Sequence, residues 1–175
     1  MVRDFAEKDI KAQDAYFNNA TDEYLLSLGV DPSKIRNRPP SNERMIATLN
    51  TPVKSRTVHT YAVDIDGKIA GISTVKKIKF GESAEMHGHL FDLENRQKGI
   101  ASGLFKEIIK KVFETFDVKL LIFEPNAVNV APNALLQKMG LKVIATYKTP
   151  AEGILLERTA NRYEMTRDWF NKING

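Results

Sequence analysis

The feature that most constrains the fold is a long helical pattern enclosed by two stretches of strand character. Over residues 98–116, apolar side chains recur at the three- and four-residue spacing of one helix face: Ile100, Leu104, Ile108, Ile109, Val112 and Phe113. Residues 84–91, which precede this pattern, favour a strand, and the apolar run 118–123 after it is typical of a buried strand. A strand, a helix and a buried strand in succession require a sheet that the helix can cover.

An Asp66-Gly67 pair upstream predicts a hairpin. It lies between two β-rich stretches, residues 58–65 and 69–75, and Gly adopts positive φ at little cost. These two strands and the strand at 84–91 would form an antiparallel meander.

The rest of the chain supplies further helices and two last strands. Residues 2–30 show mixed helical patterning, residues 131–139 read as a helix that Gly140 ends, and 141–146 and 154–165 read as strands. We therefore predict one domain over residues 1–175, of the α/β (α+β) class, with a mixed central sheet and helices on both faces.

Composition excludes several classes of protein. The chain contains no Cys, which rules out disulfides, thiolate nucleophiles and Cys-ligated zinc. No apolar run approaches the length of a membrane span, and the charged amino terminus lacks the apolar stretch of a signal peptide, so we expect a cytoplasmic protein. The net charge of +4 comes from 26 basic and 22 acidic residues that are interspersed, which favours solvated faces over a nucleic-acid surface.

The segment R-Q-K-G-I-A-S-G at residues 96–103 is the strongest candidate for a ligand site. Gly99 and Ala101 allow a ligand close to the backbone, the helix start offers unpaired N–H groups, and Arg96 and Lys98 add positive charge. Together these features suit a pyrophosphate. Alternatively, the segment is an ordinary loop whose small residues pack a helix against a sheet. Its sequence matches neither the Walker phosphate-binding loop nor the G-x-G-x-x-G motif.

Two motifs together resemble the GNAT superfamily of N-acetyltransferases. The first is R-x-x-G-x-A at Arg96–Ala101, and the second runs from Asn129 to K-M-G-L at 138–141, at the distance that the family shows. The match covers residues 57–165, and residues 1–56 correspond to variable amino-terminal helices. The resemblance implies a GNAT fold and transfer of an acetyl group from acetyl-CoA to an amine, with no metal.

The resemblance also implies which residues bind the coenzyme. Residues at the end of the third strand would present backbone to the pantetheine arm, residues 96–102 would hold the pyrophosphate, and Asn129 would bond the arm near the thioester. Asn133 would contact the coenzyme or the substrate, or alternatively cap its own helix. The implied coenzyme-binding residues are His89, Leu90, Phe91, Arg96, Gln97, Lys98, Gly99, Ile100, Ala101, Ser102, Asn129 and Asn133.

Catalysis requires a group that removes a proton from the amine, whose conjugate acid has a pKa near 10. Glu124 and Glu85 both fall on positions that serve as base in family members, and Glu124 is preferred. Many GNAT enzymes carry a Tyr acid where this chain has Leu136, and Tyr147 could replace it. The absence of Cys favours direct attack by the amine over an acyl-enzyme intermediate.

Two other interpretations remain open. His87 and His89 share a strand face and, with Glu94, resemble the metal motif of cupins, although a second His motif is missing. The second alternative is a protein with the same fold that binds coenzyme A as a sensor and has no catalytic activity. The acceptor amine is not specified, a homodimer is possible, and Arg158, Arg162 and Arg167 either face an anionic acceptor or are exposed charges.

Overall fold

A computed structural model describes residues 1–37, 42–91 and 100–174, with the backbone alone at 42–45 and 100–101. The described residues form one seven-stranded sheet with the order β1-β2-β3-β4-β5-β7-β6. Its strands are β1 (Val2–Asp4), β2 (Val58–Ile65), β3 (Lys68–Lys79), β4 (Ser83–Leu90), β5 (Leu120–Phe123), β6 (Ala145–Thr149) and β7 (Arg158–Thr166).

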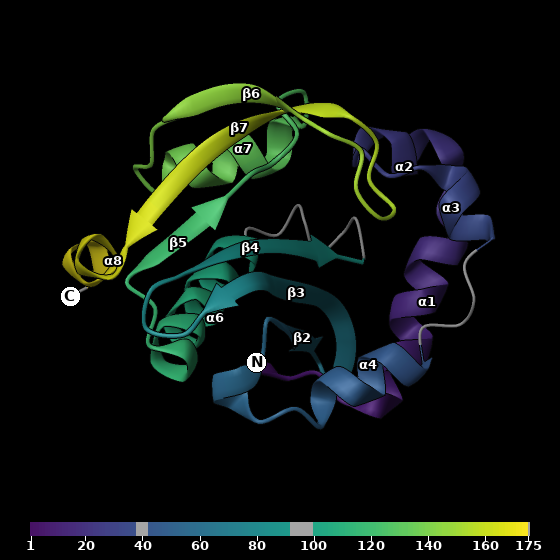
Figure 1. The fold of residues 1–175 in the computed structure, drawn as a ribbon, viewed down its shortest axis with the longest axis horizontal. Coiled ribbons are helices and arrows are strands. Elements are labelled where there is room, and N and C mark those ends of the chain that lie inside the picture. Colours follow the sequence, from purple (N-terminus) through teal and green to yellow (C-terminus); the bar gives the residue numbers. More distant parts are fainter. Residues whose placement is uncertain (38–41, 92–99, 175) are drawn as a thin grey trace.

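Helices flank the sheet on both faces, as the sequence predicts. The short helices η1 and η2 are 3-10 helices, and the others are α-helices (Figure 1). Their bounds are η1 (Glu7–Asp9), α1 (Ile10–Asn18), α2 (Asp22–Ser27), α3 (Pro32–Arg36), α4 (Asn42–Leu49), η2 (Val53–Ser55), α6 (Ile100–Phe116), α7 (Val130–Lys138) and α8 (Arg167–Asn174). No helix in the described part of the chain is long and apolar enough to cross a membrane.

The predicted hairpin is present between β2 and β3. Asp66 and Gly67 have φ of 50° and 77°, the positive values that a tight two-residue turn requires. A third strand, β4, then pairs antiparallel with β3, which completes the predicted meander.

The last two strands start later than the sequence predicts. Leu141 is buried in the core before β6 begins, and residues 154–155 bond to the turn between α2 and α3 instead of extending β7. Leu141, Ile154 and Leu155 are apolar because they pack against the core, whereas Val143 and Ile144 are exposed. The strand β1 was not predicted, since three residues are too few to show a period, and the helix α8 was not predicted either.

The contact between β4 and β5 divides the sheet. It is the parallel pair in a sheet whose other pairs are antiparallel, and it joins Ser83–Glu85 to Leu120–Ile122 alone. Beyond Glu85, β4 continues to Leu90 beside β3, while β5 ends at Phe123. Figure 1 shows β5, β7 and β6 leaning away from the end of β4.

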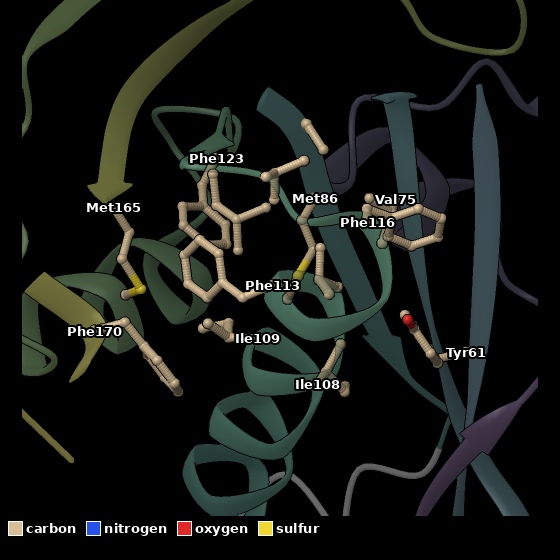
Figure 2. Packing of buried hydrophobic residues seen from close by; sticks show 14 of the residues in the cluster. Tyr61, Val75, Met86, Ile108, Ile109, Phe113, Phe116, Phe123, Met165 and Phe170 are labelled. Atoms are coloured by element: carbon tan, nitrogen blue, oxygen red, sulfur yellow. The ribbon is translucent and has the colours of Figure 1, made fainter. Parts of the chain in front are cut away.

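The main core lies under α6 and holds the two halves of the sheet together. Phe113 and Phe116 of α6 pack with Met86 of β4, Phe123 of β5 and Met165 of β7 (Figure 2). A second apolar cluster, on the opposite face, joins α1, α2 and α3 to Ala62 and Ile72.

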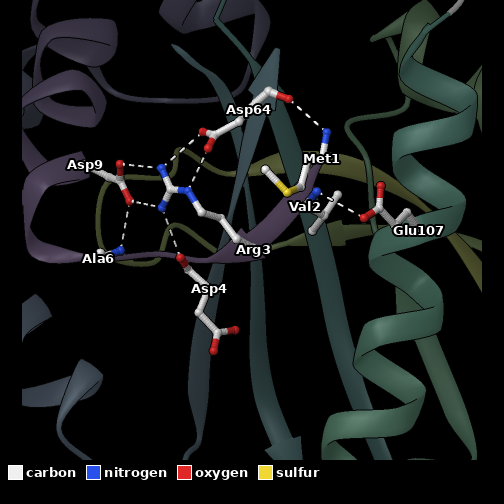
Figure 3. A network of polar contacts seen from close by, with 8 residues as sticks. All are labelled: Met1, Val2, Arg3, Asp4, Ala6, Asp9, Asp64 and Glu107. Atoms are coloured by element: carbon white, nitrogen blue, oxygen red, sulfur yellow. Dashed lines mark hydrogen bonds and ion pairs between the residues drawn. The ribbon is translucent and has the colours of Figure 1, made fainter. Parts of the chain in front are cut away.

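A polar network fixes β1 to the start of the helical segment. The Arg3 guanidinium donates to Asp9 at 2.6 and 2.9 Å and to Asp64 at 2.7 and 3.1 Å (Figure 3). Burial acts to raise the pKa of Asp9, but hydrogen bonds from Arg3 and from the Ala6 N–H outweigh it, so the net shift is downward.

Replacing Arg3 with Ala should destabilise the fold by about 3 kcal/mol at neutral pH, because it leaves the buried Asp9 carboxylate without its cation. The pKa of Asp9 is lowered in the folded state, so the pair stabilises above the unfolded value near 4 and loses that effect as pH falls through the folded value. Urea unfolding should therefore give a lower free energy of unfolding for R3A than for the parent protein, and this difference should become smaller as the pH is lowered.

The exposed pair of Lys110 and Glu114 provides the control. Its side chains are 68% and 63% exposed, so Lys110→Ala should change stability by less than about 0.5 kcal/mol. Equal losses in the two variants would contradict the importance of the Arg3 network.

Candidate functional site

The sequence motif for anion binding lies at the start of α6. Arg96, Gln97, Lys98 and Gly99, together with Glu94, lie outside the described residues. The described helix begins at Ile100, so Ile100, Ala101 and Ser102 form its first turn. This turn belongs to a 17-residue helix whose N-terminal dipole is positive.

One face of the sheet gathers the candidate catalytic side chains. Ala84 and Leu121 are paired in register and both lie in the core under α6, so Glu85 and its partner Ile122 point to the opposite face. Side chains along a strand alternate between the two faces, so His87, two residues after Glu85, and Glu124, two residues after Ile122, share that face. They lie beyond the last paired residues of β4 and β5, where the two strands separate.

Glu124 has one oriented oxygen and one that is open. Its Oε1 accepts hydrogen bonds from the Tyr147 hydroxyl and from Arg162 Nη1, the latter at 3.1 Å. Its Oε2 accepts no hydrogen bond from the residues that the structure describes. Burial, with the hydrogen bond to Glu124, raises the pKa of Tyr147. Tyr147 and Arg162 therefore hold the carboxylate in place while Oε2 stays able to accept a proton.

Glu85 is enclosed by two lysines. Lys77 Nζ lies 2.7 Å from Oε1 and Lys76 Nζ lies 3.4 Å from Oε2, and Glu85 itself is 9% exposed. Consecutive strand residues normally point to opposite faces, but β3 has an irregularity after Lys76, and Lys77 adopts φ of 50°. The bulge thus brings both cations to one carboxylate, a pairing that no sequence period reveals.

His87 and His89 lie close together but form no metal site with a third ligand. Their ring centroids are 5.8 Å apart, and the described residues contain no group of three His, Asp or Glu side chains that could hold a metal ion. Although His87 is exposed by surface area, the atoms around its ring desolvate it, and this lowers its pKa, with His89, Lys76 and Arg158 adding to the effect. The open sheet with helices on both faces is also not a cupin barrel, so that interpretation of His87, His89 and Glu94 loses its scaffold.

The end of β4 packs against the amino-terminal helices. Phe91 stacks on Tyr16 with centroids 4.6 Å apart, and His89 Nδ1 lies 3.5 Å from the Tyr16 hydroxyl. The Phe91 N–H already donates to the Ala70 carbonyl at 2.8 Å. The Phe91 N–H, which was predicted to contact the coenzyme, is therefore already bonded to β3.

Asn133 is a structural anchor for the turn before α7. It is 7% exposed, and its Nδ2 donates to the carbonyls of Asn126 and Asn129 at 3.0 and 2.7 Å. Its Oδ1 accepts from Tyr163 and Asn161, both at 2.9 Å. This satisfies every polar group of the amide, so of the two predicted roles the contacts favour capping.

Asn129, in contrast, keeps its side chain available. It precedes the first residue of α7, and its side chain makes no capping bond and no other hydrogen bond within the described residues. Asn133 donates to the Asn129 carbonyl, which holds the backbone of Asn129 in place while its side-chain amide is left available.

Two other sequence candidates have structural roles. Leu136, at the position of the usual Tyr acid, is 3% exposed and packs in the main core. Arg167 donates to the carbonyls of Val118 and Phe113 and pairs with Asp117, far along β7 from Glu124. The sequence missed the roles of Lys76 and Lys77, and it gave Arg162 no link to Glu124, because partners on different strands leave no local signal.

A pocket of about 360 Å³ lies elsewhere, between β1 and α4. At its wall Arg56 donates to Nδ1 of His59 at 2.7 Å, which leaves Nε2 to donate to Asp4 at 3.1 Å. Burial lowers the pKa of His59, so this ring is held neutral. The pocket contains none of the residues around Glu124.

No protein-family model matches the chain, and no curated protein matches it in sequence. Solved structures do match. The aminoglycoside acetyltransferase AAC(6')-Ib in complex with coenzyme A is 14% identical, with a TM-score of 0.74, over 100% of this chain and 99% of that chain.

Two further structures resemble the chain over nearly their whole length. Spermidine N-acetyltransferase from Vibrio cholerae, in complex with CoA and spermine, is 12% identical, with a TM-score of 0.76, over 98% of this chain and 97% of that chain. RimL, a ribosomal L7/L12 alpha-N-protein acetyltransferase in complex with coenzyme A, is 15% identical, with a TM-score of 0.76, over 96% of this chain and 94% of that chain. The chain therefore has the fold of the GNAT acetyltransferases, as the two motifs imply.

Replacing Asn133 with Ala should lower the free energy of unfolding by about 2–4 kcal/mol, because it leaves two carbonyls, a hydroxyl and an amide without their partner. Chemical denaturation measures the loss. Asn37→Ala is the matched control, since Asn37 is exposed and, within the described residues, makes one side-chain bond, to the Ser33 carbonyl, and it should cost less than about 1 kcal/mol. A loss in N133A no larger than in N37A would show that the anchor is unimportant.

Proposed function

We propose that the protein is an N-acetyltransferase that moves an acetyl group from acetyl-CoA to a primary amine by direct attack. The observation that carries this proposal is the placement of Glu124, with one oxygen oriented and the other open, where β4 and β5 separate. The three solved structures named above are acetyltransferases, and each is in complex with coenzyme A.

The separation of β4 and β5 provides the place for the pantetheine arm. Past Glu85 the two strands no longer bond to each other, so main-chain groups of β4 can face a ligand that lies between the halves of the sheet. The side chain of Asn129 would bond this arm near the thioester. Residues 96–102 would receive the pyrophosphate at the start of α6, where N–H groups and the helix dipole favour an anion.

The chemistry needs a base and a nucleophile, and the chain supplies the base. Glu124 Oε2 takes a proton from the acceptor ammonium, and the neutral nitrogen attacks the thioester carbonyl carbon. A C–N bond forms, the C–S bond breaks, and the thiolate of coenzyme A leaves with the electron pair. The nitrogen then loses its second proton to this thiolate, which gives the neutral amide and free coenzyme A thiol. No Cys is available for an acyl-enzyme intermediate, so the attack is direct.

Tyr147 fits this scheme as the residue that orients Glu124. Its proton points to Oε1, so the described arrangement aims it at the carboxylate and not at a leaving thiolate. Glu85 does not fit the role of base, because two lysines neutralise it. The first test of the scheme is whether the coenzyme binds at all.

Isothermal titration of the metal-stripped protein with acetyl-CoA should show micromolar binding, since the pyrophosphate meets both a helix start and basic side chains.

Arg96→Ala should raise KM for acetyl-CoA about tenfold, as one charge-assisted contact to phosphate is lost. Lys110→Ala, at an exposed position on the same helix, is the control and should leave KM unchanged.

Absence of binding would contradict the proposal. Binding without thiol release in the presence of any amine would favour the coenzyme-binding sensor instead. The observation that favours this second function is that buried Leu136 occupies the position where many GNAT enzymes carry the Tyr general acid.

Replacing Glu124 with Gln should lower kcat by about 10²-fold, because the amide cannot accept the proton while the hydrogen bonds to Tyr147 and Arg162 can persist. The loss should shrink at high pH, where the amine deprotonates without help. Glu164→Gln is the matched control, since Glu164 lies on the same face and also pairs with Arg162, at 2.8 Å. An unchanged kcat in E124Q at every pH would exclude Glu124 as the base.

A further inference from the structure

Arg158 is a half-buried cation with no counter-ion among the described residues. It begins β7, and its guanidinium makes no hydrogen bond or ion pair with the residues that the structure describes. The other arginine on this face of β7, Arg162, is paired with Glu124 and Glu164. A cation that is partly removed from water and left unpaired costs free energy unless a ligand completes it.

The stem of Arg158 lies against the turn between α2 and α3. Gly29, in the turn between α2 and α3, has φ of +77°, and a Cβ there would lie 2.9 Å from Cδ of Arg158. Backbone hydrogen bonds of 2.8 and 2.9 Å tie the loop before β7 to this turn, through the Asp31 N–H to the Ile154 carbonyl and the Leu156 N–H to the Gly29 carbonyl. A larger residue at position 29 would require the Arg158 side chain to shift, and it would also have to adopt the positive φ.

Arg158 also faces the place where the chemistry is proposed. Residues 158 and 162 share a face of β7, because they are an even number of positions apart. The charge of Arg158 contributes to the lowered pKa of His87, which puts the guanidinium within electrostatic reach of the end of β4. The carbon chain of an acceptor could therefore lie over β7 with its ends at Glu124 and Arg158.

The spacing between these two groups sets the length of the acceptor. The ion pair with Arg162 places Glu124 level with residue 162, four residues from residue 158. At about 3.3 Å per residue the two levels are about 13 Å apart. An ammonium at Glu124 and an anionic group at Arg158 would be separated by about this distance, less the inward reach of the side chains.

We propose that the acceptor is an amine whose far end carries an anionic group, a carboxylate or a phosphate, and that Arg158 binds this group. The proposal rests on the acetyltransferase function argued above and names the class of its second substrate. A guanidinium binds either anion through two parallel hydrogen bonds, which also orients the acceptor so that its amine points to Glu124.

The test compares three homologous series of straight-chain primary amines that end in a carboxylate, a phosphate or a hydroxyl. Thiol release at saturating acetyl-CoA gives kcat/KM for each member. We expect one anionic series to exceed the hydroxyl series by about tenfold or more at its best chain length, the value of one charge-assisted pair. The series with the larger ratio identifies the anion.

Variants then assign the preference to Arg158. In Arg158→Gln the ratio of anionic to hydroxyl acceptors should fall to about one, and Arg158→Lys should retain part of it, because the charge stays but the forked donor is lost. Lys148→Gln is the matched control: it removes an exposed cation from the neighbouring strand, with 79% of the side chain exposed, and should keep the ratio.

Equal kcat/KM for anionic and hydroxyl acceptors in the parent protein would overturn this proposal while leaving the acetyltransferase function intact. A ratio that persists in Arg158→Gln would do the same. Absence of thiol release with every amine, despite coenzyme binding, would overturn the proposed function, and this inference with it.

Discussion

The short parallel contact between β4 and β5 is the constraint on which the rest of the structure depends. Three residue pairs join the halves of the sheet, and beyond them the strands separate. The main-chain groups that lose a strand partner there are expensive to bury unpaired, so this place suits a ligand that bonds to backbone. The core under α6 lets the sheet open without coming apart, because Phe113 and Phe116 pack against strands from both halves.

The charges around this opening are arranged so that two similar carboxylates differ in what they can do. Glu85 lies where a bulge in β3 adds a second lysine, and its charge is neutralised within the fold. Glu124 receives both of its donors on one oxygen, so the other remains able to take a proton. The difference follows from the neighbours that register and the bulge in β3 bring to each carboxylate, since both residues are glutamates at the same face of one sheet.

Much of the fold could be predicted because it depends on local patterns. The stripe on α6, the turn at residues 66–67 and the apolar run of β5 each follow from period or backbone preference. The preference for Glu124 over Glu85 came from a motif position, and the contacts around each carboxylate support it. The limits of β6 and β7 were misjudged because residues 141 and 154–155 are apolar for packing outside any strand.

The sequence by itself determined the kinds of element, their order and the identity of the groups available for chemistry, because periodicity, turn residues and side-chain type are properties of neighbours along the chain. Only the tertiary structure decided which of those groups meet. The pairing of Arg162 with Glu124, the two lysines on Glu85 and the packing of Arg158 over Gly29 all join residues from different elements. Such contacts depend on register, bulges and loop closure, and each of these is fixed by the packing of the whole molecule.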